Sequence, residues 1–165
     1  MRRASLLTLA AALLLAGCGF QLRQAPHFAF NTIYVGAAPS SSLGNELKRT
    51  IAFSDGVTVI GEPARANSAQ VVLDVLADQR EKVVVGLTAS GQVREFQLRT
   101  RLRFKLRTPQ GKELIPETEL LQQRDISFNE SAVLAKEAEE NLLYRDMQTD
   151  LVQQLMRRLA ALKTL

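Results

Sequence analysis

Residues 95–107, EFQLRTRLRFKLR, decide the architecture of this 165-residue chain. In a β-strand successive side chains point to opposite faces of the sheet, so alternation of apolar and polar residues predicts a strand with one buried face. The segment alternates in this way along most of its length. We expect an apolar face of Phe96, Leu98, Leu102, Phe104 and Leu106, and a polar face of Gln97, Arg99, Arg101, Arg103, Lys105 and Arg107.

Turn signals on both sides of this strand predict an antiparallel meander. Ser90-Gly91 precedes the strand and is a candidate hairpin turn, while Thr108-Pro109-Gln110-Gly111 follows it and suits a three-residue loop with a left-handed glycine. We expect the neighbouring strands at about 70–87 and 112–128. In the first of these, one side would hold Val71, Leu73, Val75 and Ala77, and the other Asp74 and Asp78.

Two helices are predicted outside the meander. Ser40-Ser41-Ser42 offers hydroxyl caps for a helix in which Leu43, Leu47 and Ile51 recur every four residues. A long helix follows the capping residue Asn129, and its apolar stripe comprises Met147, Leu151, Leu155 and Leu159. Short strands are expected at 32–35 and 57–60.

These elements predict an α+β fold. The economical arrangement is a two-layer sandwich, with two helices packed on one face of a mainly antiparallel four-stranded sheet. The other face of the sheet would then meet water, a ligand or another protein.

The N-terminus predicts export and a lipid anchor. Arg2 and Arg3 precede an apolar stretch from Leu6 to Leu15 that is too short to span a bilayer. Leu15-Ala16-Gly17-Cys18 resembles the lipobox of bacterial lipoproteins, which implies cleavage before Cys18 and acylation of its thiol. We expect a signal peptide at 1–17, a lipidated tether at 18–30 and a single domain at 31–165. Since the residue after Cys18 is not aspartate, the outer membrane is favoured, with the domain on its periplasmic side.

The residue inventory argues against an enzyme. His27 is the sole histidine and lies in the predicted tether, so no serine in the folded domain would have a histidine general base. A glycine-rich phosphate loop is absent, and one histidine with a lipidated cysteine makes a zinc site improbable. We expect no catalytic residue, metal or cofactor. Nucleic acid is a poor candidate partner, because the chain has no tryptophan and aromatics do not alternate with arginines on the polar face.

The basic row of the central strand has two possible roles. It could bind phosphates or an acidic partner, or cross-strand carboxylates could neutralise it. A three-residue loop at 109–111 would place Arg103 opposite Glu117 and Arg101 opposite Glu119. A two-residue loop at Ser90-Gly91 would place Asp78 opposite Arg103 and Asp74 opposite Arg107. We favour a largely neutralised face, on which these registers leave Arg99 and Lys105 unpaired.

Four fragments together resemble the family of the LPS-assembly lipoprotein LptE. They are Cys18-Gly19-Phe20-Gln21-Leu22-Arg23, Gly91-Gln92 with Glu95-Phe96-Gln97-Leu98, Asn129 with Leu134-Ala135-Lys136-Glu137, and Asp146-Met147 with Gln154-Leu155-Met156-Arg157-Arg158-Leu159. The resemblance implies two helices on a four-stranded sheet. It also implies an outer-membrane lipoprotein that plugs the β-barrel LptD, assists its assembly and binds lipopolysaccharide on its way to the cell surface.

The resemblance also suggests binding residues. A family lysine at the start of the last helix is linked to lipopolysaccharide binding and matches Lys136. A second family basic residue falls at 88–90, where this chain has no charge, and Arg94 is the candidate substitute. Together with the unpaired Arg99 and Lys105, these are our candidate lipopolysaccharide contacts. The alternative function is a lipid-anchored periplasmic accessory subunit of a lipid-trafficking transporter.

Overall fold

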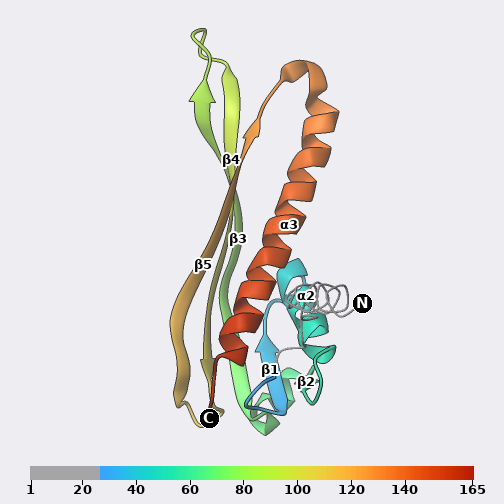
Figure 1. The fold of residues 1–165 in the computed structure, drawn as a ribbon, viewed down its shortest axis with the longest axis vertical. Coiled ribbons are helices and arrows are strands. Elements are labelled where there is room, and N and C mark those ends of the chain that lie inside the picture. The colour runs from blue at the N-terminus through green and yellow to red at the C-terminus, as the bar shows by residue number, and fades with distance from the viewer. Residues whose placement is uncertain (1–26) are drawn as a thin grey trace, which may run out of the picture.

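The computed structural model describes residues 27–165 and shows one long sheet covered on one side by helices (Figure 1). The strand order is β2-β1-β3-β4-β5. The elements are β1 Thr32–Gly36, α2 Ser42–Ala52, β2 Thr58–Ile60, β3 Val71–Leu87, β4 Val93–Arg107, β5 Glu113–Ser127 and α3 Val133–Ala160, with short 3-10 helices at Pro63–Ser68 and Glu130–Ala132.

The expected α+β class is correct, but the sheet has five strands and is mixed, where four mainly antiparallel strands were predicted. The strands β3, β4 and β5 form the predicted antiparallel meander. By contrast, β1 pairs in parallel with both β2 and β3. The reason is the connection between β1 and β2, which runs through α2, because parallel neighbours need a crossover that a helix supplies.

Both helices bury their apolar stripes against the same face of the sheet. Ser41 begins α2 by accepting a hydrogen bond from the Gly44 amide through its side-chain Oγ, at 2.8 Å. The long helix α3 runs beside the sheet along the longest axis of the molecule (Figure 1). The main core includes Leu43, Leu47 and Ile51 of α2, Leu151, Leu155 and Leu159 of α3, and Ile33, Leu73, Leu102 and Phe104 of the sheet.

A polar residue separates this core from a second, smaller one. Thr100 lies on the helix side of β4 between Leu98 and Leu102, is 1% exposed, and its hydroxyl has no hydrogen-bond partner among the described residues. Leu102 belongs to the main core, whereas Leu98 packs with Ile126, Tyr144 and Met147 in the second. The half of the molecule that holds the β3–β4 turn and the start of α3 therefore has its own small core.

An irregularity in β3 reverses the predicted faces of its second half. The register with β4 shifts between Val75 and Ala77, which pair with Phe104 and Arg103. Ala77 therefore lies on the face opposite to Val75, although the sequence placed them together. Between this β-bulge and Val84, even-numbered residues of β3 point to the helix side, and among them are Asp78, Arg80 and Lys82.

The folded domain also extends further toward the N-terminus than the predicted start at residue 31. Phe28 and Phe30, which were assigned to the tether, are 5% and 1% exposed and belong to the main core. Their rings stack with centroids 5.2 Å apart. The apolar burial of these two rings therefore moves the start of the packed domain to at least Phe28.

Candidate functional site

A pocket of about 70 Å³ opens at the end of the molecule where α3 begins. Its apolar lining comes from Phe96 of β4, Ile126 of β5, Phe128 after β5, and Val133 of α3. Two lysines from different elements also line it, Lys82 of β3 and Lys136 of α3, together with Glu137 and Glu140 of α3. The pocket thus combines an apolar lining with charged groups at its margin.

Lys136, the residue predicted from the family, is held in place by two neighbours. Its Nζ donates to Ser127 Oγ at 3.0 Å and to Glu139 Oε2 at 2.9 Å. The Lys136 side chain is only 23% exposed, so it lies along the pocket instead of extending into solvent. An anionic ligand would have to share this ammonium group with Glu139.

Arg94 lies at the same end of the molecule, in an adjoining open hollow of about 270 Å³. Phe128 lines both hollows, and its backbone amide donates to the Arg94 carbonyl at 2.7 Å. The guanidinium is exposed and makes no hydrogen bond or ion pair with any side chain that the structure describes. Arg94 is therefore an available cation close to Lys136.

Lys82 was missed by the sequence analysis. Its Nζ lies 2.6 Å from Glu140 Oε2 and 4.3 Å from the centroid of the Phe96 ring. The bulge in β3 brings Lys82 to the helix side, and no alternation rule locates a bulge in advance. The only sequence signal for Lys82 was its position in the strand that leads into the predicted β3–β4 turn.

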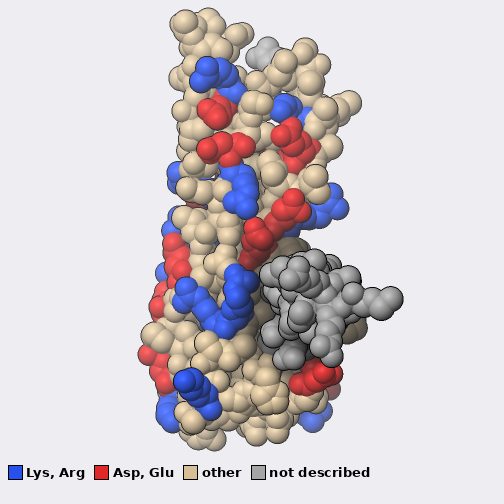
Figure 2. Space-filling view, viewed as in Figure 1, with Lys and Arg blue, Asp and Glu red and all other residues tan. Residues whose placement is uncertain are grey.

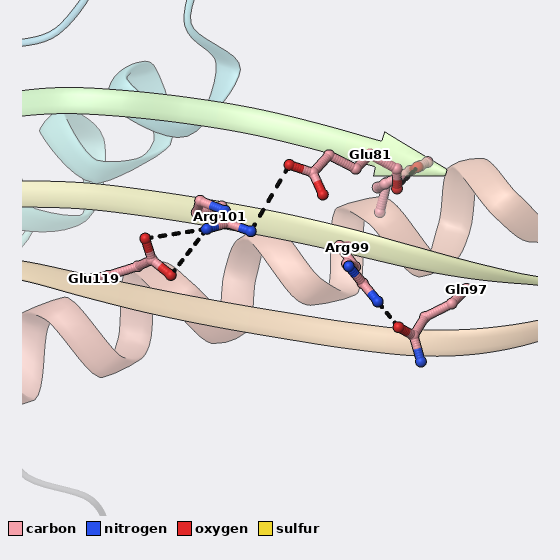
Figure 3. A network of polar contacts seen from close by, with 6 residues as sticks. Glu81, Gln97, Arg99, Arg101 and Glu119 are labelled. Carbon is pink, nitrogen blue, oxygen red and sulfur yellow. Dashed lines mark hydrogen bonds and ion pairs between the residues drawn. The ribbon is translucent and has the colours of Figure 1, made fainter. Parts of the chain in front are cut away.

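The opposite, outer face of the sheet carries the basic row of β4 (Figure 3). Arg101 contacts Glu119 at 3.3 Å and Glu81 at 3.9 Å. The other ion pairs of this row join Arg103 to Glu117 at 3.1 Å and Arg107 to Asp74 at 2.7 Å. Largely neutralised arginines were the favoured interpretation, and these ion pairs confirm it.

The predicted registers were wrong, because Arg103 lies opposite Glu119, Arg101 opposite Leu121 and Asp74 opposite Lys105, so the three ion pairs form diagonally. The fourth expected pair, of Asp78 with Arg103, does not form. Asp78 pairs with Leu102 in the register and accepts a hydrogen bond from Ser41 Oγ at 2.7 Å, so it does not face Arg103. The cause is the β3–β4 turn, in which the Thr88 amide bonds the Gln92 carbonyl and three residues, not two, form the loop. Its glycine, Gly91, has a φ of 82°, as such a loop requires.

Arg99 and Lys105 remain without a carboxylate partner among residues 27–165. Arg99 Nε donates to Gln97 Oε1 at 2.8 Å (Figure 3). Both residues point to the outer face, whereas Lys136 lies on the helix side and Arg94 lines the hollow that adjoins the Lys136 pocket. The structure therefore places Lys136 and Arg94 in adjoining hollows, and it places Arg99 and Lys105 on the opposite face of the sheet from Lys136.

Polar side chains also join α3 to β3 and α2. Arg80 Nη2 donates to Gln148 Oε1 at 2.7 Å, and the Arg80 guanidinium lies 5.3 Å from the centroid of the Tyr144 ring. Burial raises the pKa of the Tyr144 hydroxyl above its ordinary value, and the nearby Glu140 carboxylate raises it further. In residues 27–165, no cluster of histidine, cysteine and acidic side chains is arranged to hold a metal ion.

The sequence matches a known family over most of its length. Residues 30–159 fit the family model described as LptE, lipopolysaccharide-assembly. The chain belongs to the LptE family. It is 28% identical over 152 residues to the LPS-assembly lipoprotein LptE of Pectobacterium atrosepticum, covering 90% of this chain and 80% of that protein. Identity to the Yersinia enterocolitica LptE is also 28%, over 90% of this chain and 71% of that protein.

The fold is similar to that of a solved structure. The solution NMR structure of a lipoprotein B from Nitrosomonas europaea has a TM-score of 0.73 and 33% identity, and it covers 87% of this chain and 91% of that one. Cys18, the predicted lipidation site, lies outside the described residues. Within residues 27–165, neither α2 nor α3 combines the length and apolar character that crossing a bilayer requires.

Proposed function

We propose that this LptE-family protein is a lipid-anchored outer-membrane component of lipopolysaccharide assembly. It would plug an LptD-like β-barrel, assist the assembly of that barrel and bind lipopolysaccharide during transport to the cell surface. Family membership over residues 30–159 and the printed names of the relatives, LPS-assembly lipoproteins, support this proposal. The role is one of binding, without catalysis.

The outer face of the sheet suits a plug inside a water-filled barrel. No described element covers this face, and its arginines are paired with carboxylates of the neighbouring strands. Figure 2 shows acidic and basic side chains interspersed along the visible side of the molecule, without an extended field of one sign. A polar surface of mixed charge is compatible with a wet, polar lumen.

The observation that carries lipopolysaccharide binding is the proximity of Lys136 and Arg94 beside an apolar pocket. Lipid A has phosphates, which cationic side chains bind through charge-assisted hydrogen bonds, and acyl chains, which Phe128 and Val133 could contact. Arg99 and Lys105 lie on the other side of the sheet, so we assign them at most a separate contact with anions.

Lipopolysaccharide binding is tested by Lys136→Asp in the full-length lipoprotein. The substitution places a carboxylate next to the phosphate site, so binding of purified lipopolysaccharide should weaken by about tenfold or more. Lys112→Asp is the matched control, since Lys112 is exposed in the β4–β5 turn at the opposite end of the molecule (Figure 1). Equal binding by wild type and Lys136→Asp would remove Lys136 from the site.

The lipid anchor and the β-barrel partner are both tested in membranes. Cys18→Ala should release a soluble periplasmic protein, because the acyl chains hold the domain at the membrane. Extraction of wild type in mild detergent should recover a stable complex with a large outer-membrane β-barrel. Recovery without any barrel would instead favour the accessory subunit of a lipid-trafficking transporter.

A further inference from the structure

Lys82 and Lys136 reach one pocket from different elements. Lys82 projects from the helix side of β3, and Lys136 projects from the first turn of α3. Each ammonium group contacts a carboxylate of α3, Lys82 with Glu140 at 2.6 Å and Lys136 with Glu139 at 2.9 Å. The two acidic residues are adjacent in sequence.

The resting pocket has no spare positive charge. Its margin carries Glu137 and Glu140, and Glu139 contacts Lys136, so carboxylates outnumber ammonium groups. Glu140 competes with a phosphate for the Lys82 ammonium group, to which it is bound at 2.6 Å. Both side chains of this ion pair are partly exposed, 37% for Lys82 and 21% for Glu140. Because such pairs contribute little free energy, an anion with more charge and more acceptor oxygens than a carboxylate can replace Glu140.

Phe96 is a second contact of the Lys82 ammonium group, separate from Glu140. The ring lies 4.3 Å from Nζ, within the range of a cation–π contact. The same ring contributes to the apolar lining of the pocket, together with Ile126, Phe128 and Val133. A molecule with a phosphate next to a hydrocarbon chain matches this arrangement of cation and apolar surface.

We propose that Lys82 is a further phosphate contact for lipopolysaccharide, besides Lys136 and Arg94, and that Glu140 masks it until the lipid displaces the carboxylate. This proposal rests on the lipopolysaccharide-binding function proposed above. Arg94, which has no described side-chain partner, makes the first contact with the anion, Lys136 shares its ammonium group between the anion and Glu139, and Lys82 becomes available as Glu140 is displaced. The two glutamates thus set the affinity of the site from within the protein.

The experiment measures the affinity of labelled lipopolysaccharide for the full-length lipoprotein in detergent, at one fixed salt concentration. Lys82→Gln should weaken binding by about threefold, and Glu140→Gln should strengthen it by a similar factor. Lys82→Arg keeps the charge and should retain most of the affinity. Lys112→Gln, at the far end of the sheet, is the matched control and should leave the affinity unchanged.

A double variant separates masking from general repulsion. If Glu140 acts by holding Lys82, Glu140→Gln should strengthen binding by a clearly smaller factor in the Lys82→Gln background than in wild type. Equal factors in both backgrounds would overturn the masking role. Circular dichroism melting curves of every variant verify that the fold persists.

Binding measurements with modified ligands identify the chemical group that the site recognises. Dephosphorylated lipopolysaccharide should bind wild type and Lys82→Gln equally, and inorganic phosphate should compete only weakly because it lacks the hydrocarbon chain. Strong competition by inorganic phosphate alone would contradict a lipid site. Absence of lipopolysaccharide binding to wild type would overturn the proposed function and this inference together. Normal binding that is indifferent to Lys82 and Glu140 would overturn only the inference.

Discussion

The hydroxyl of Tyr144 on α3 donates a hydrogen bond of 2.8 Å to the backbone carbonyl of Glu81 on β3. Beyond Asp74, no strand within residues 27–165 pairs with β3 on the side where β1 ends, so its backbone groups on that edge need other partners. Tyr144 satisfies one of them from the small second core, in which its ring packs with Leu98 and Met147. This bond therefore fastens the first half of α3 to an otherwise unpaired edge.

Removing the hydroxyl should destabilise the protein at neutral pH. Tyr144→Phe leaves the Glu81 carbonyl without its partner, and we expect the free energy of unfolding to fall by about 1 kcal/mol. Denaturant titration at pH 7 measures this difference. An unchanged unfolding free energy would show that water replaces the hydroxyl at no cost.

The raised pKa of Tyr144 predicts a loss of stability in alkali. The folded state holds the phenol proton more tightly than the unfolded state, whose pKa is near the ordinary 10.0. The stabilisation is therefore complete below pH 10 and is lost as the pH rises through the folded-state pKa. In Tyr34→Phe, Tyr144 is the sole remaining tyrosine, so phenolate absorbance reports its titration directly. A midpoint at or below 10 would contradict the prediction.

The unpaired hydroxyl of Thr100 offers a stabilising substitution. Thr100→Val keeps the shape of the side chain but removes a buried polar group that has no partner among the described residues. The unfolding free energy should rise by about 1 kcal/mol, because the desolvation cost of the hydroxyl disappears. Thr100→Ser, which retains the hydroxyl and loses the methyl group, should lower it. If valine is also destabilising, the hydroxyl has a partner that the geometry does not reveal.

Gly44 is required by a close approach in the first turn of α2. A Cβ at this position would lie 2.5 Å from the Cβ of Ala37, and neither atom can rotate away. Gly44→Ala should therefore destabilise the protein by about 1–2 kcal/mol, despite the better helix propensity of alanine. Gly61→Ala is the control, since nothing lies within 4 Å of its added Cβ. Ala37→Gly should rescue Gly44→Ala in thermal unfolding; failure to do so would locate the strain elsewhere.

The sequence predicted those parts of the fold that follow from regular periodicity. The alternation in β4 identified its buried face, and the four-residue spacing of Leu151 and Leu155 identified the packed side of α3. The ion pairs of Arg101 and Arg103 were also predicted, although the register between β4 and β5 shifts near Pro116. Arginine side chains are long enough to reach the expected carboxylate diagonally, so the pairs survive the change of register.

The site was only half predictable, because irregularities determine the rest. Lys136 came from the family resemblance, and Arg94 from its place beside the turn. Lys82 and Glu140 meet because the bulge after Val75 turns the following even-numbered side chains of β3 to the helix side. Alternation alone places Lys82 on the outer face. The parallel pairing of β1 was missed for a related reason, since short strands carry no periodic sign of direction.

The ion pairs on the outer sheet face should contribute unequally to stability. Arg101 lies between Glu119 and Glu81 and is less exposed than Arg103, which has the single partner Glu117. Arg101→Gln removes both contacts and leaves two carboxylates near each other, so the unfolding free energy should fall by up to about 1 kcal/mol. Arg103→Gln should cost only a few tenths of a kcal/mol, since both partners of its pair are about half exposed.

Salt distinguishes this electrostatic effect from lost packing. At about 1 M salt the Debye length shrinks to roughly 3 Å, so the difference between Arg101→Gln and wild type should shrink as well. Adding Glu119→Gln to Arg101→Gln should recover part of the loss, because it removes one of the two unpaired carboxylates. Denaturant midpoints at low and high salt measure both effects. A cost that stays constant with salt would mean that the aliphatic stem of Arg101 packs on the sheet and its charge contributes nothing.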